Sequence, residues 1–414
     1  MPDTSSSSRP PAPVKRLHIA EFVAMTASLM AMNALAIDIM LPALSDISAS
    51  YSLENPNDRQ LVIVVYMLGF GVSQLVWGPL TDRFGRRPIL WFTLLGYSIG
   101  GLGCVFAPDF GFLLAARTLQ GVMAGASRVI AMAAARDIYS GRRMAQVMSL
   151  VMMTFMAAPI LAPSIGQFIL FFAGWHAIFW VLVVFGLIML VWCGLRLPET
   201  LPPDRRTPLN VSSILKSYGT VFRTRDTLGY MIASGLIFGG LFSFISSSEQ
   251  VFREVYDTGT AFPLWFAGVA VAMSAANLLN SRFVISLGMR RISHGALLGF
   301  IVVSALHVLL AAQGLAPFPV FYALLLAAFF AIGLQGPNYN AIMMEPLGRL
   351  AGSGSAVSGF VTSFGSGLIG GAIARTFDGS TTPIFIGHLL LGLGALLAIL
   401  ITERGRLMRP QTLD

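Results

Sequence analysis

The amino-acid sequence contains twelve apolar stretches that are each long enough to cross a lipid bilayer as a helix. A membrane-spanning helix needs about 20 apolar residues to cross roughly 30 Å of hydrocarbon. Stretches of this kind begin near Leu17, Gln60, Pro88, Gly111, Ala145, Trp175, Thr227, Phe262, Ser293, Phe318, Ser355 and Pro383. Only 11 % of the residues are charged, whereas soluble domains contain about 25 %. The chain is therefore predicted to be an all-α integral membrane protein with twelve transmembrane helices in the lipid bilayer.

The positions of the basic residues support this count and predict the orientation. With residue 1 placed in the cytoplasm, the inner segments hold 22 of the 27 Lys and Arg residues, and a single span holds two. The outer segments hold three, which are Arg59, Arg253 and Arg375. Cytoplasmic segments of membrane proteins carry the excess of Lys and Arg, so both termini are predicted to be cytoplasmic. The net charge of +8 is explained by this orientation and does not indicate a nucleic-acid partner.

The longest hydrophilic connection divides the spans into six and six. We expect a disordered cytoplasmic tail (1–16), an N-terminal six-helix bundle (17–195), a cytoplasmic linker (196–226), a C-terminal six-helix bundle (227–403) and a second tail (404–414). The loop after the second span contains Gly-Arg-Arg at 85–87, and the loop after the eighth contains Gly-Met-Arg-Arg at 288–291. This degenerate repeat predicts two pseudo-symmetric bundles related in parallel, which is the architecture of one large class of transporters.

Three segments carry a resemblance to a known family. The loop GPLTDRFGRRPIL, from Gly78 to Leu90, resembles the signature loop of the major facilitator superfamily. ALAIDIMLPAL in the first span and RTLQGVMAGASRVIAMAAARDIY in the fourth resemble the Bcr/CflA branch of drug:proton antiporters. The resemblance extends to QGPNYNAIMMEPLGRLAGSGSAVSGF in the second half. It implies the major facilitator fold and a multidrug efflux transporter of the bacterial cell inner membrane, of the kind that confers antibiotic resistance. It also implies a monomer that exchanges protons for a drug-like small molecule without a cofactor or metal.

The resemblance assigns a conformational latch to the loop after the second span and the inner end of the fourth. In the family, such a network is thought to hold helices together in the outward-open state. The corresponding residues are Gly78, Asp82, Arg83, Gly85, Arg86, Arg87, Arg136 and Asp137. Gly78 and Gly85 are expected to allow tight turns and close helix approach. Anchoring of arginines at the inner membrane surface is the alternative, and it leaves Asp82 unexplained.

Three charged residues lie well inside the apolar stretches, namely Asp38, Arg117 and Arg128. A charge at the centre of a membrane costs about 2.5–3.5 kcal/mol even on the lenient insertion scale, so such residues usually face a cavity. Counting along the first span outward and the fourth span inward at 1.5 Å per residue places Asp38 and Arg117 at a similar depth in the outer part of the membrane. Arg128 lies about three turns further inward.

This placement suggests a mechanism of proton coupling. Desolvation raises the pKa of a carboxylate and a nearby arginine lowers it, so helices that move past each other can load and unload a proton. Asp38 is the candidate carboxylate, exchanging its proton with the periplasm and competing with a cationic or polar drug. Arg117, within the motif Arg117-x-x-Gln120-Gly121, is the neighbour that would reset it. A static buried ion pair that holds spans one and four in register is the alternative.

One family feature is imperfect. Antiporters of the family typically carry Gly-Pro-x-x-Gly-Gly in the fifth span, whereas this chain has Ala158-Pro159 followed by Ala162-Pro163 and Gly166-Gln167. Pro159 and Pro163 are expected to bend the span, because each removes a backbone donor, and Gly166 completes this helix-bend motif. The departure weakens the assignment of antiport.

Other polar residues within the spans are candidates for lining a central cavity, although each is equally well explained by hydrogen bonds between helices. These candidates are Asn33, Tyr66, Gln74, Gln120, Arg128, Asn277, Gln335, Asn338 and Asn340.

Rival classes of protein are disfavoured by what the sequence lacks. The five histidines are scattered, with no HExxH motif, so no catalytic residues and no metal ligands are assigned. The two lysines, Lys15 and Lys216, do not follow glycine, so a phosphate-binding loop of a primary pump is absent. A non-transporting receptor would not need Asp38 and Arg117 within its spans. A proton-coupled importer or facilitator of a small metabolite on the same fold stays open, because residue spacing does not display the direction of transport.

Overall fold

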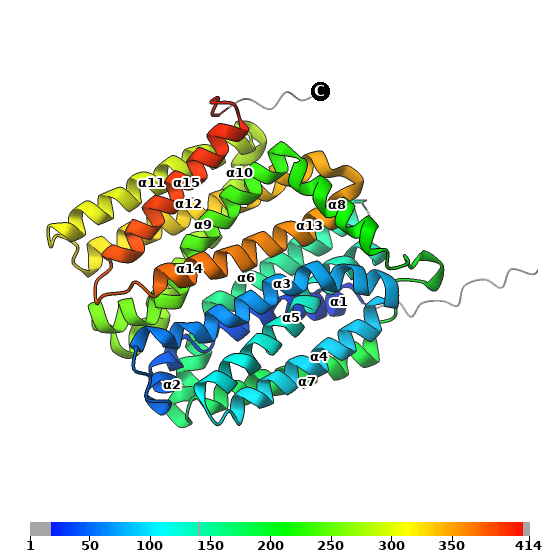
Figure 1. The fold of residues 1–414 in the computed structure, drawn as a ribbon, viewed down its shortest axis with the longest axis horizontal. Helices are drawn as coiled ribbons and strands as arrows, with labels where there is room; N and C mark the ends of the chain where they lie inside the picture. The colour runs from blue at the N-terminus through cyan, green and yellow to red at the C-terminus, as the bar shows by residue number, and fades with distance from the viewer. Residues whose placement is uncertain (1–17, 140, 409–414) are drawn as a thin grey trace, which may run out of the picture.

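The computed structural model describes residues 18–139 and 141–408, and the regular elements of these residues are all helices (Figure 1). Eleven helices are long and apolar enough to cross a membrane by length and composition. The twelfth long helix, Phe110–Ile138, carries Arg117 and Arg128 and is not among these eleven. The predicted twelve-helix membrane fold is confirmed.

The N-terminal half contains the first six spans, with a short outer segment between the first two. The spans are α1 (Ile19–Asp38), α3 (Leu61–Phe84), α4 (Arg86–Val105), α5 (Phe110–Ile138), α6 (Gly141–Phe172) and α7 (His176–Arg196). After α1 the chain turns through the 3-10 helix η1 (Leu41–Ala43), α2 (Leu44–Ser50) and the 3-10 helix η2 (Pro56–Gln60). We call the end of the bundle that carries these segments the outer end, following the predicted orientation.

The C-terminal half contains the other six spans. They are α9 (Arg225–Gln250), α10 (Phe262–Leu287), α11 (Met289–Ala312), α12 (Phe318–Met344), the composite span α13 (Ala351–Phe360), η7 (Val361–Gly365) and α14 (Ser366–Ala374), and α15 (Thr382–Thr402). The π-helical segments Val251–Val255 (η4), which continues α9, and η7 widen the helix locally. Such segments are frequent at functional sites.

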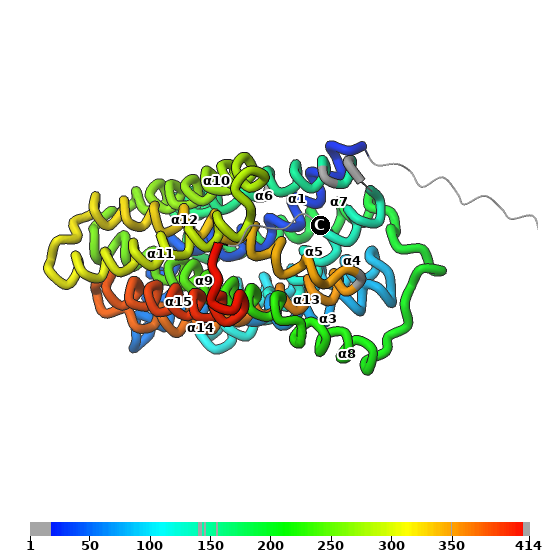
Figure 2. Tube along the Cα trace, turned by 90° about the horizontal axis from the view of Figure 1, so that it is seen from above, coloured from blue at the N-terminus to red at the C-terminus, as the bar shows by residue number. Residues whose placement is uncertain are grey.

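The two halves lie side by side along the length of the spans (Figures 1 and 2). They meet along two seams, one between α3 and the composite span α13–η7–α14, and one between α6 and α10. At the outer end, η1 also contacts α9. No comparable contact joins α5 to α12 among the described elements. These two helices are therefore not part of the seams.

The internal repeat predicted from the sequence has a structural counterpart. Gly85 joins α3 to α4 with φ 97° and ψ 159°, and Gly288 joins α10 to α11 with φ 83° and ψ 149°. Only glycine adopts this backbone conformation without strain. In both turns the glycine N–H donates to the carbonyl four residues earlier, Thr81 in one half and Val284 in the other. The two halves thus repeat the same turn at corresponding loops.

The connection between the halves contains a helix that the sequence analysis did not predict. Helix α8 (Val211–Arg223) begins at Asn210, whose side chain accepts a hydrogen bond from the N–H of Ser213 at 3.0 Å. Such an N-cap satisfies a backbone donor that would otherwise lack a partner. The Tyr218 hydroxyl donates to the carbonyl of Leu75 at 2.9 Å, so α8 is tied to the N-terminal half.

Candidate functional site

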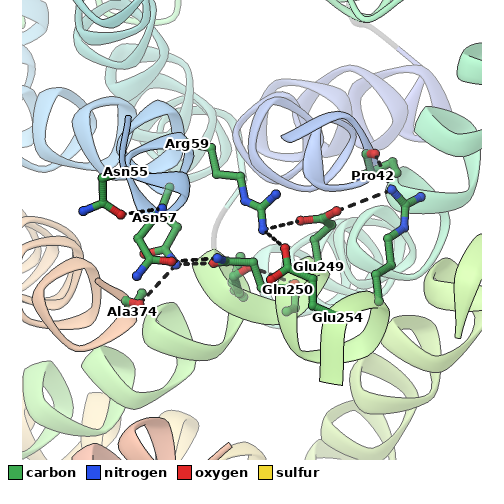
Figure 3. A network of polar contacts seen from close by, with 12 residues as sticks. Pro42, Asn55, Asn57, Arg59, Glu249, Gln250, Glu254 and Ala374 are labelled. Atoms are coloured by element: carbon green, nitrogen blue, oxygen red, sulfur yellow. Dashed lines mark hydrogen bonds and ion pairs between the residues drawn. The ribbon is translucent and has the colours of Figure 1, made fainter. Parts of the chain in front are cut away.

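A cluster of buried charges joins the two halves at the outer end (Figure 3). Arg59, in η2 just before α3, lies 3.5 Å from the carboxylate of Glu249 in α9 and also pairs with Glu254. Arg253 lies 3.4 Å from the other carboxylate oxygen of Glu249. Arg59 is 4 % exposed and Glu249 is 2 % exposed. Glu249 is therefore held between one arginine of the other half and one arginine of its own half.

Polar side chains extend this cluster across the interface. Arg253 donates to the side chain of Gln167 at 2.7 Å and to the carbonyl of Pro42 at 3.1 Å, both in the N-terminal half. Gln250 donates to Asn57 at 2.7 Å and accepts from Gln60. These contacts connect η1, η2 and the outer part of α6 to α9 and η4.

A third ion pair completes the outer closure. Arg375, after α14, donates to Asp58 at 2.6 Å. Among side chains that the structure describes, the ion pairs between the two halves are those of Arg59 and Arg375, and all lie at the outer end. The structure is thus closed toward the outside by ionic contacts.

The sequence analysis missed this cluster, although a signal was present. Arg59, Arg253 and Arg375 are the three basic residues of the outer segments, where the positive-inside bias disfavours them. All three are used in contacts between the halves. An arginine in an outer segment is thus a marker for a specific partner in this chain.

Arg117 is completely buried within the N-terminal half and is held by neutral groups. Its guanidinium donates to the carbonyl of Val62 at 3.1 Å, to the carbonyl of Ala36 at 3.0 Å and to the side chain of Gln120 at 2.7 Å. It also lies 4.4 Å from the centre of the Tyr66 ring, which is a cation–π contact. Arg117 therefore fixes α1, α3 and α5 relative to one another.

Asp38 is buried at the end of α1, with 4 % exposure. The predicted depth agrees with the structure, since Arg117 bonds to the carbonyl of Ala36, two residues before Asp38. No ion pair or side-chain hydrogen bond joins Asp38 to Arg117 or to another described residue. The static ion pair considered as an alternative is therefore not formed in this structure.

The predicted latch residues form a network at the inner end of the N-terminal half. Arg86 donates to Asp82 at 2.6 Å, to Thr81 at 2.7 Å and to Asp137 at 3.3 Å. Glu199, after α7, accepts the backbone N–H of Arg86 at 2.9 Å. These described partners all lie in the N-terminal half or the linker. In this conformation the network therefore braces α3, α4, α5 and the linker, and does not join the two halves.

The remaining predicted latch residues differ in their contacts and exposure. Arg87 donates to the carbonyl of Gly194, whereas Arg83 and Arg136 are exposed. Gly85 is confirmed as a turn glycine, and a Cβ there would lie 2.4 Å from Glu199. The expectation for Gly78 is wrong, because it lies inside α3 and a Cβ would meet nothing within 4 Å. No neighbouring helix approaches α3 at that point.

Most of the proposed cavity-lining residues are packed between helices in this structure. Tyr66 lies under Arg117, and Gln120 accepts a hydrogen bond from it. Gln74 donates to Ser363 of the other half at 3.1 Å. The buried amides of the C-terminal half, Gln335 and Asn338, donate to carbonyls of their own helix, and Asn338 also donates to Asn280 at 2.6 Å. For these five residues the helix-packing alternative describes the structure.

Four candidates retain some exposure. Asn33 and Asn277 are half-buried, and Asn340 is exposed. The carbonyl oxygen of the Asn33 side chain has no hydrogen-bond partner. Arg128 is exposed although it lies well inside the span of α5.

The predicted helix-bend motif lies within the fifth span, as expected from the sequence. Pro159 and Pro163 both lie within the helix α6. A Cβ on Gly166 would lie 1.9 Å from the carbonyl oxygen of Ile39, so glycine is needed where α6 crosses the end of α1. At Gln167, where the family pattern has glycine, the side chain accepts a hydrogen bond from Arg253.

Two six-helix halves that repeat the same turn form the architecture found in one large class of membrane transporters. The sequence model of the Major Facilitator Superfamily matches residues 26–371, and the chain belongs to that superfamily. It is a multi-pass membrane protein that transports small molecules and is not an enzyme.

Relatives of the chain carry names that refer to drug resistance. A bicyclomycin resistance protein homolog of Haemophilus influenzae is 30 % identical over 355 residues, which cover 84 % of this chain and 87 % of that protein. Multidrug resistance protein D of Escherichia coli is 27 % identical over 406 residues, which cover 93 % and 96 %. The solved structure of the Escherichia coli xylose transporter XylE, in a partially occluded inward open conformation, is 13 % identical and superposes with a TM-score of 0.71 over 95 % of this chain and 99 % of that one. This last likeness shows the shared fold.

Proposed function

We propose that this protein is a bacterial inner-membrane exporter that moves drug-like small molecules out of the cytoplasm in exchange for protons. The names of its relatives, which refer to multidrug and bicyclomycin resistance, support export. The excess of basic residues in the inner segments supports cytoplasmic termini. We expect the protein to act as a monomer, since the two halves within one chain supply both sides of the transport pathway.

Asp38 is the observation that carries the proton-coupled part of the proposal. It is a buried carboxylate in the first span without a described ion-pair or hydrogen-bond partner. A buried charge normally needs a partner, so a carboxylate without one has to gain a proton or a ligand as its surroundings change. Asp38 also lies at the outer end, five residues before Ala43 of η1, which belongs to the segment that contacts α9. Opening of the outer closure would expose this region to the periplasm.

In this proposal Arg117 changes the proton affinity of Asp38 when the distance between the two side chains changes. It holds the carbonyl of Ala36 in α1 and the carbonyl of Val62 in α3. Movement of α1 during transport would change the distance between the guanidinium and Asp38, and with it the proton affinity of the carboxylate. The inner network around Arg86 is proposed to be the latch of the outward-open state, in which its carboxylates would gain partners from the other half.

The test uses purified protein in liposomes with an imposed pH gradient, and measures whether candidate drugs dissipate that gradient. We expect drug-dependent proton flux for the wild-type protein and none for Asp38→Asn, with both variants inserted and folded. Asp46→Asn is the matched control, because Asp46 is an exposed carboxylate on the adjacent α2. Normal flux in Asp38→Asn would refute the assignment of Asp38.

The direction of transport needs a separate measurement. Cells that express the protein should accumulate less of an exported compound than cells without it. Increased accumulation across a compound panel would instead favour the importer of a small metabolite on the same fold. The ionic outer closure is compatible with both directions.

A further inference from the structure

Arg128 is a charged residue that has no ion-pair or hydrogen-bond partner among the described residues. It lies in α5, 11 residues after Arg117, which at 1.5 Å and about 100° per residue is about 16 Å further inward and within about 20° of the same helix face. That face is directed into the N-terminal half at Arg117, which bonds to α1 and α3. Arg117 is 0 % exposed, whereas Arg128 is exposed. The accessible guanidinium thus lies on an interior face of the span.

Lipid and the membrane surface do not explain this exposure. Arg128 is 10 residues from Ile138, the last residue of α5, which corresponds to about 15 Å along the helix. This exceeds the length of an arginine side chain, so the guanidinium cannot reach the interface as side chains near helix ends do. An arginine exposed to hydrocarbon would be strongly unfavourable. The guanidinium therefore lies in space that water can enter between the helices.

The described acidic residues in the inner part of this half pair with other arginines. Glu21 of α1 pairs with Arg196 at 2.6 Å. Asp82 and Asp137 both pair with Arg86. The hydrogen bond from Arg117 to Ala36 shows which residues of α1 and α5 lie at the same depth. Arg128 lies 11 residues further inward on α5, so the residues of α1 at its depth are those about 11 positions before Ala36, which are residues 24–28. These are Ala-Met-Thr-Ala-Ser, without a charge, and Ala24 is exposed.

We infer that Arg128 binds an anionic group of the transported molecule, so that the preferred substrates are small molecules with a carboxylate or a similar oxyanion. A guanidinium presents a planar fork of donors that matches a carboxylate in two parallel hydrogen bonds. An unpaired arginine within a span is otherwise costly, and a charged substrate supplies the missing counter-charge only while it is bound. The inference rests on the proposed transport function and narrows the substrate class.

The charges within the membrane-spanning helices of the N-terminal half agree with this assignment. The spans of the N-terminal half carry two arginines, Arg117 and Arg128, and one carboxylate, Asp38, well inside the membrane. When Asp38 holds a proton, this interior is more positive still. A cation would be repelled from Arg128, whereas an anion compensates it. Among drug-like molecules, those with an acidic group are therefore preferred over purely cationic ones.

Binding of two matched fluorescent probes tests the inference. Dansylglycine carries a carboxylate, and dansylglycinamide is its neutral counterpart with the same aromatic group. We expect the wild-type protein to bind dansylglycine more tightly, and Arg128→Gln to weaken that binding about ten- to a hundredfold, the range expected for a charge-assisted hydrogen bond. Binding of dansylglycinamide should change less than about twofold. Arg128→Lys, which keeps the charge, should recover most of the affinity for dansylglycine.

Arg223→Gln is the control for loss of one positive charge, because Arg223 is exposed on the linker helix α8. Equal binding of both probes, equal loss of both in Arg128→Gln, or no binding of dansylglycine at millimolar concentration would each overturn the inference. The proton-flux assay separates it from the proposed function. Drug-dependent flux without an anion preference refutes the role of Arg128 alone, whereas Arg128-dependent anion binding without proton flux refutes the antiport alone.

Discussion

Replacing Glu249 by glutamine removes the central charge of the outer closure and should shift the protein toward outer-open conformations. At 3.5 Å from Arg59, two opposite unit charges attract by about 5 kcal/mol at an effective dielectric constant of about 20. Arg59 keeps its pair with Glu254 in the variant, and desolvation offsets part of the attraction. We therefore expect the outer-closed state to lose about 2–3 kcal/mol relative to the outer-open state, which is a factor of roughly 30 to 150 in their ratio.

Distances between spin labels at the outer end measure this shift without a substrate. Glu54 and Thr376 are exposed outer residues of the two halves and are suitable labelling sites. The chain has only two cysteines, Cys104 and Cys193, and both are buried, so alanine can replace them in the labelling background. The wild-type protein should give a short distance, and Glu249→Gln should add or enlarge a population at longer distance.

The exposed pair of Arg375 and Asp58 provides the matched control. The two side chains are 48 % and 31 % exposed, and exposed ion pairs contribute about 0–1 kcal/mol. Asp58→Asn should therefore shift the ratio of the two states by less than about fivefold. Glu249→Asp keeps the charge and should resemble the wild type more than Glu249→Gln does. The reasoning is refuted by an unchanged distance distribution in Glu249→Gln, or by an equal shift in Asp58→Asn.

Two further predictions concern stability. Gly121→Ala should lower the thermal unfolding temperature in detergent, because the new Cβ would lie 2.1 Å from the carbonyl oxygen of Tyr66 and force α5 away from α3, at a cost of about 1–3 kcal/mol. In the control Gly78→Ala the new Cβ meets nothing within 4 Å, so the unfolding temperature should stay the same or rise. Glu403, after α15, is a pH-dependent element: burial alone would raise the pKa of its carboxyl, but the hydrogen bond from Arg290 at 2.7 Å helps to bring the pKa below its ordinary value of 4.5. The stability that this ion pair contributes is complete above the ordinary pKa and is lost as pH falls through the lowered pKa. Glu403→Gln should therefore lower the unfolding temperature at pH 7, and on acidification below about pH 4.5 its unfolding temperature should fall less than that of the wild type. An acid dependence equal to that of the wild type would argue against the pair.

The sequence predicted the fold because the solvent imposes it. Within a bilayer every backbone group has to be satisfied inside its own helix, so the length of each apolar stretch was sufficient to define a span. The turn at Gly85 was also predicted, and the degenerate repeat indicated that the loop containing Gly288 corresponds to it. Helix α8 was missed because it lies in a polar connection, where hydropathy carries no signal.

The candidate site was predicted only in part, because lateral contacts do not follow from depth. The depth of Arg117 relative to α1 agrees with the structure, yet its partners are the carbonyls of Ala36 and Val62 rather than Asp38. The side chains of residues two positions apart in a helix differ by about 200° in direction. Asp38 therefore points away from Arg117, which bonds to the carbonyl of Ala36. The contacts of Glu249 could not be predicted, because they join segments almost 200 residues apart in the sequence.

The polar character of the outer closure suits a protein that has to open there in each cycle. An apolar seam would expose hydrophobic surface to water on opening, at a cost that grows with its area. Arg59, Glu249 and Gln250 can instead exchange their partners for water, so that the net free energy of opening is much smaller than the sum of the contacts. A two-state transporter needs this balance, because a proton or a substrate can shift the equilibrium only by its difference in affinity for the two states, and that difference amounts to a few kcal/mol. The ionic contacts of the outer closure therefore leave the outer-closed and outer-open states close enough in free energy for a proton or a substrate to shift the equilibrium between them.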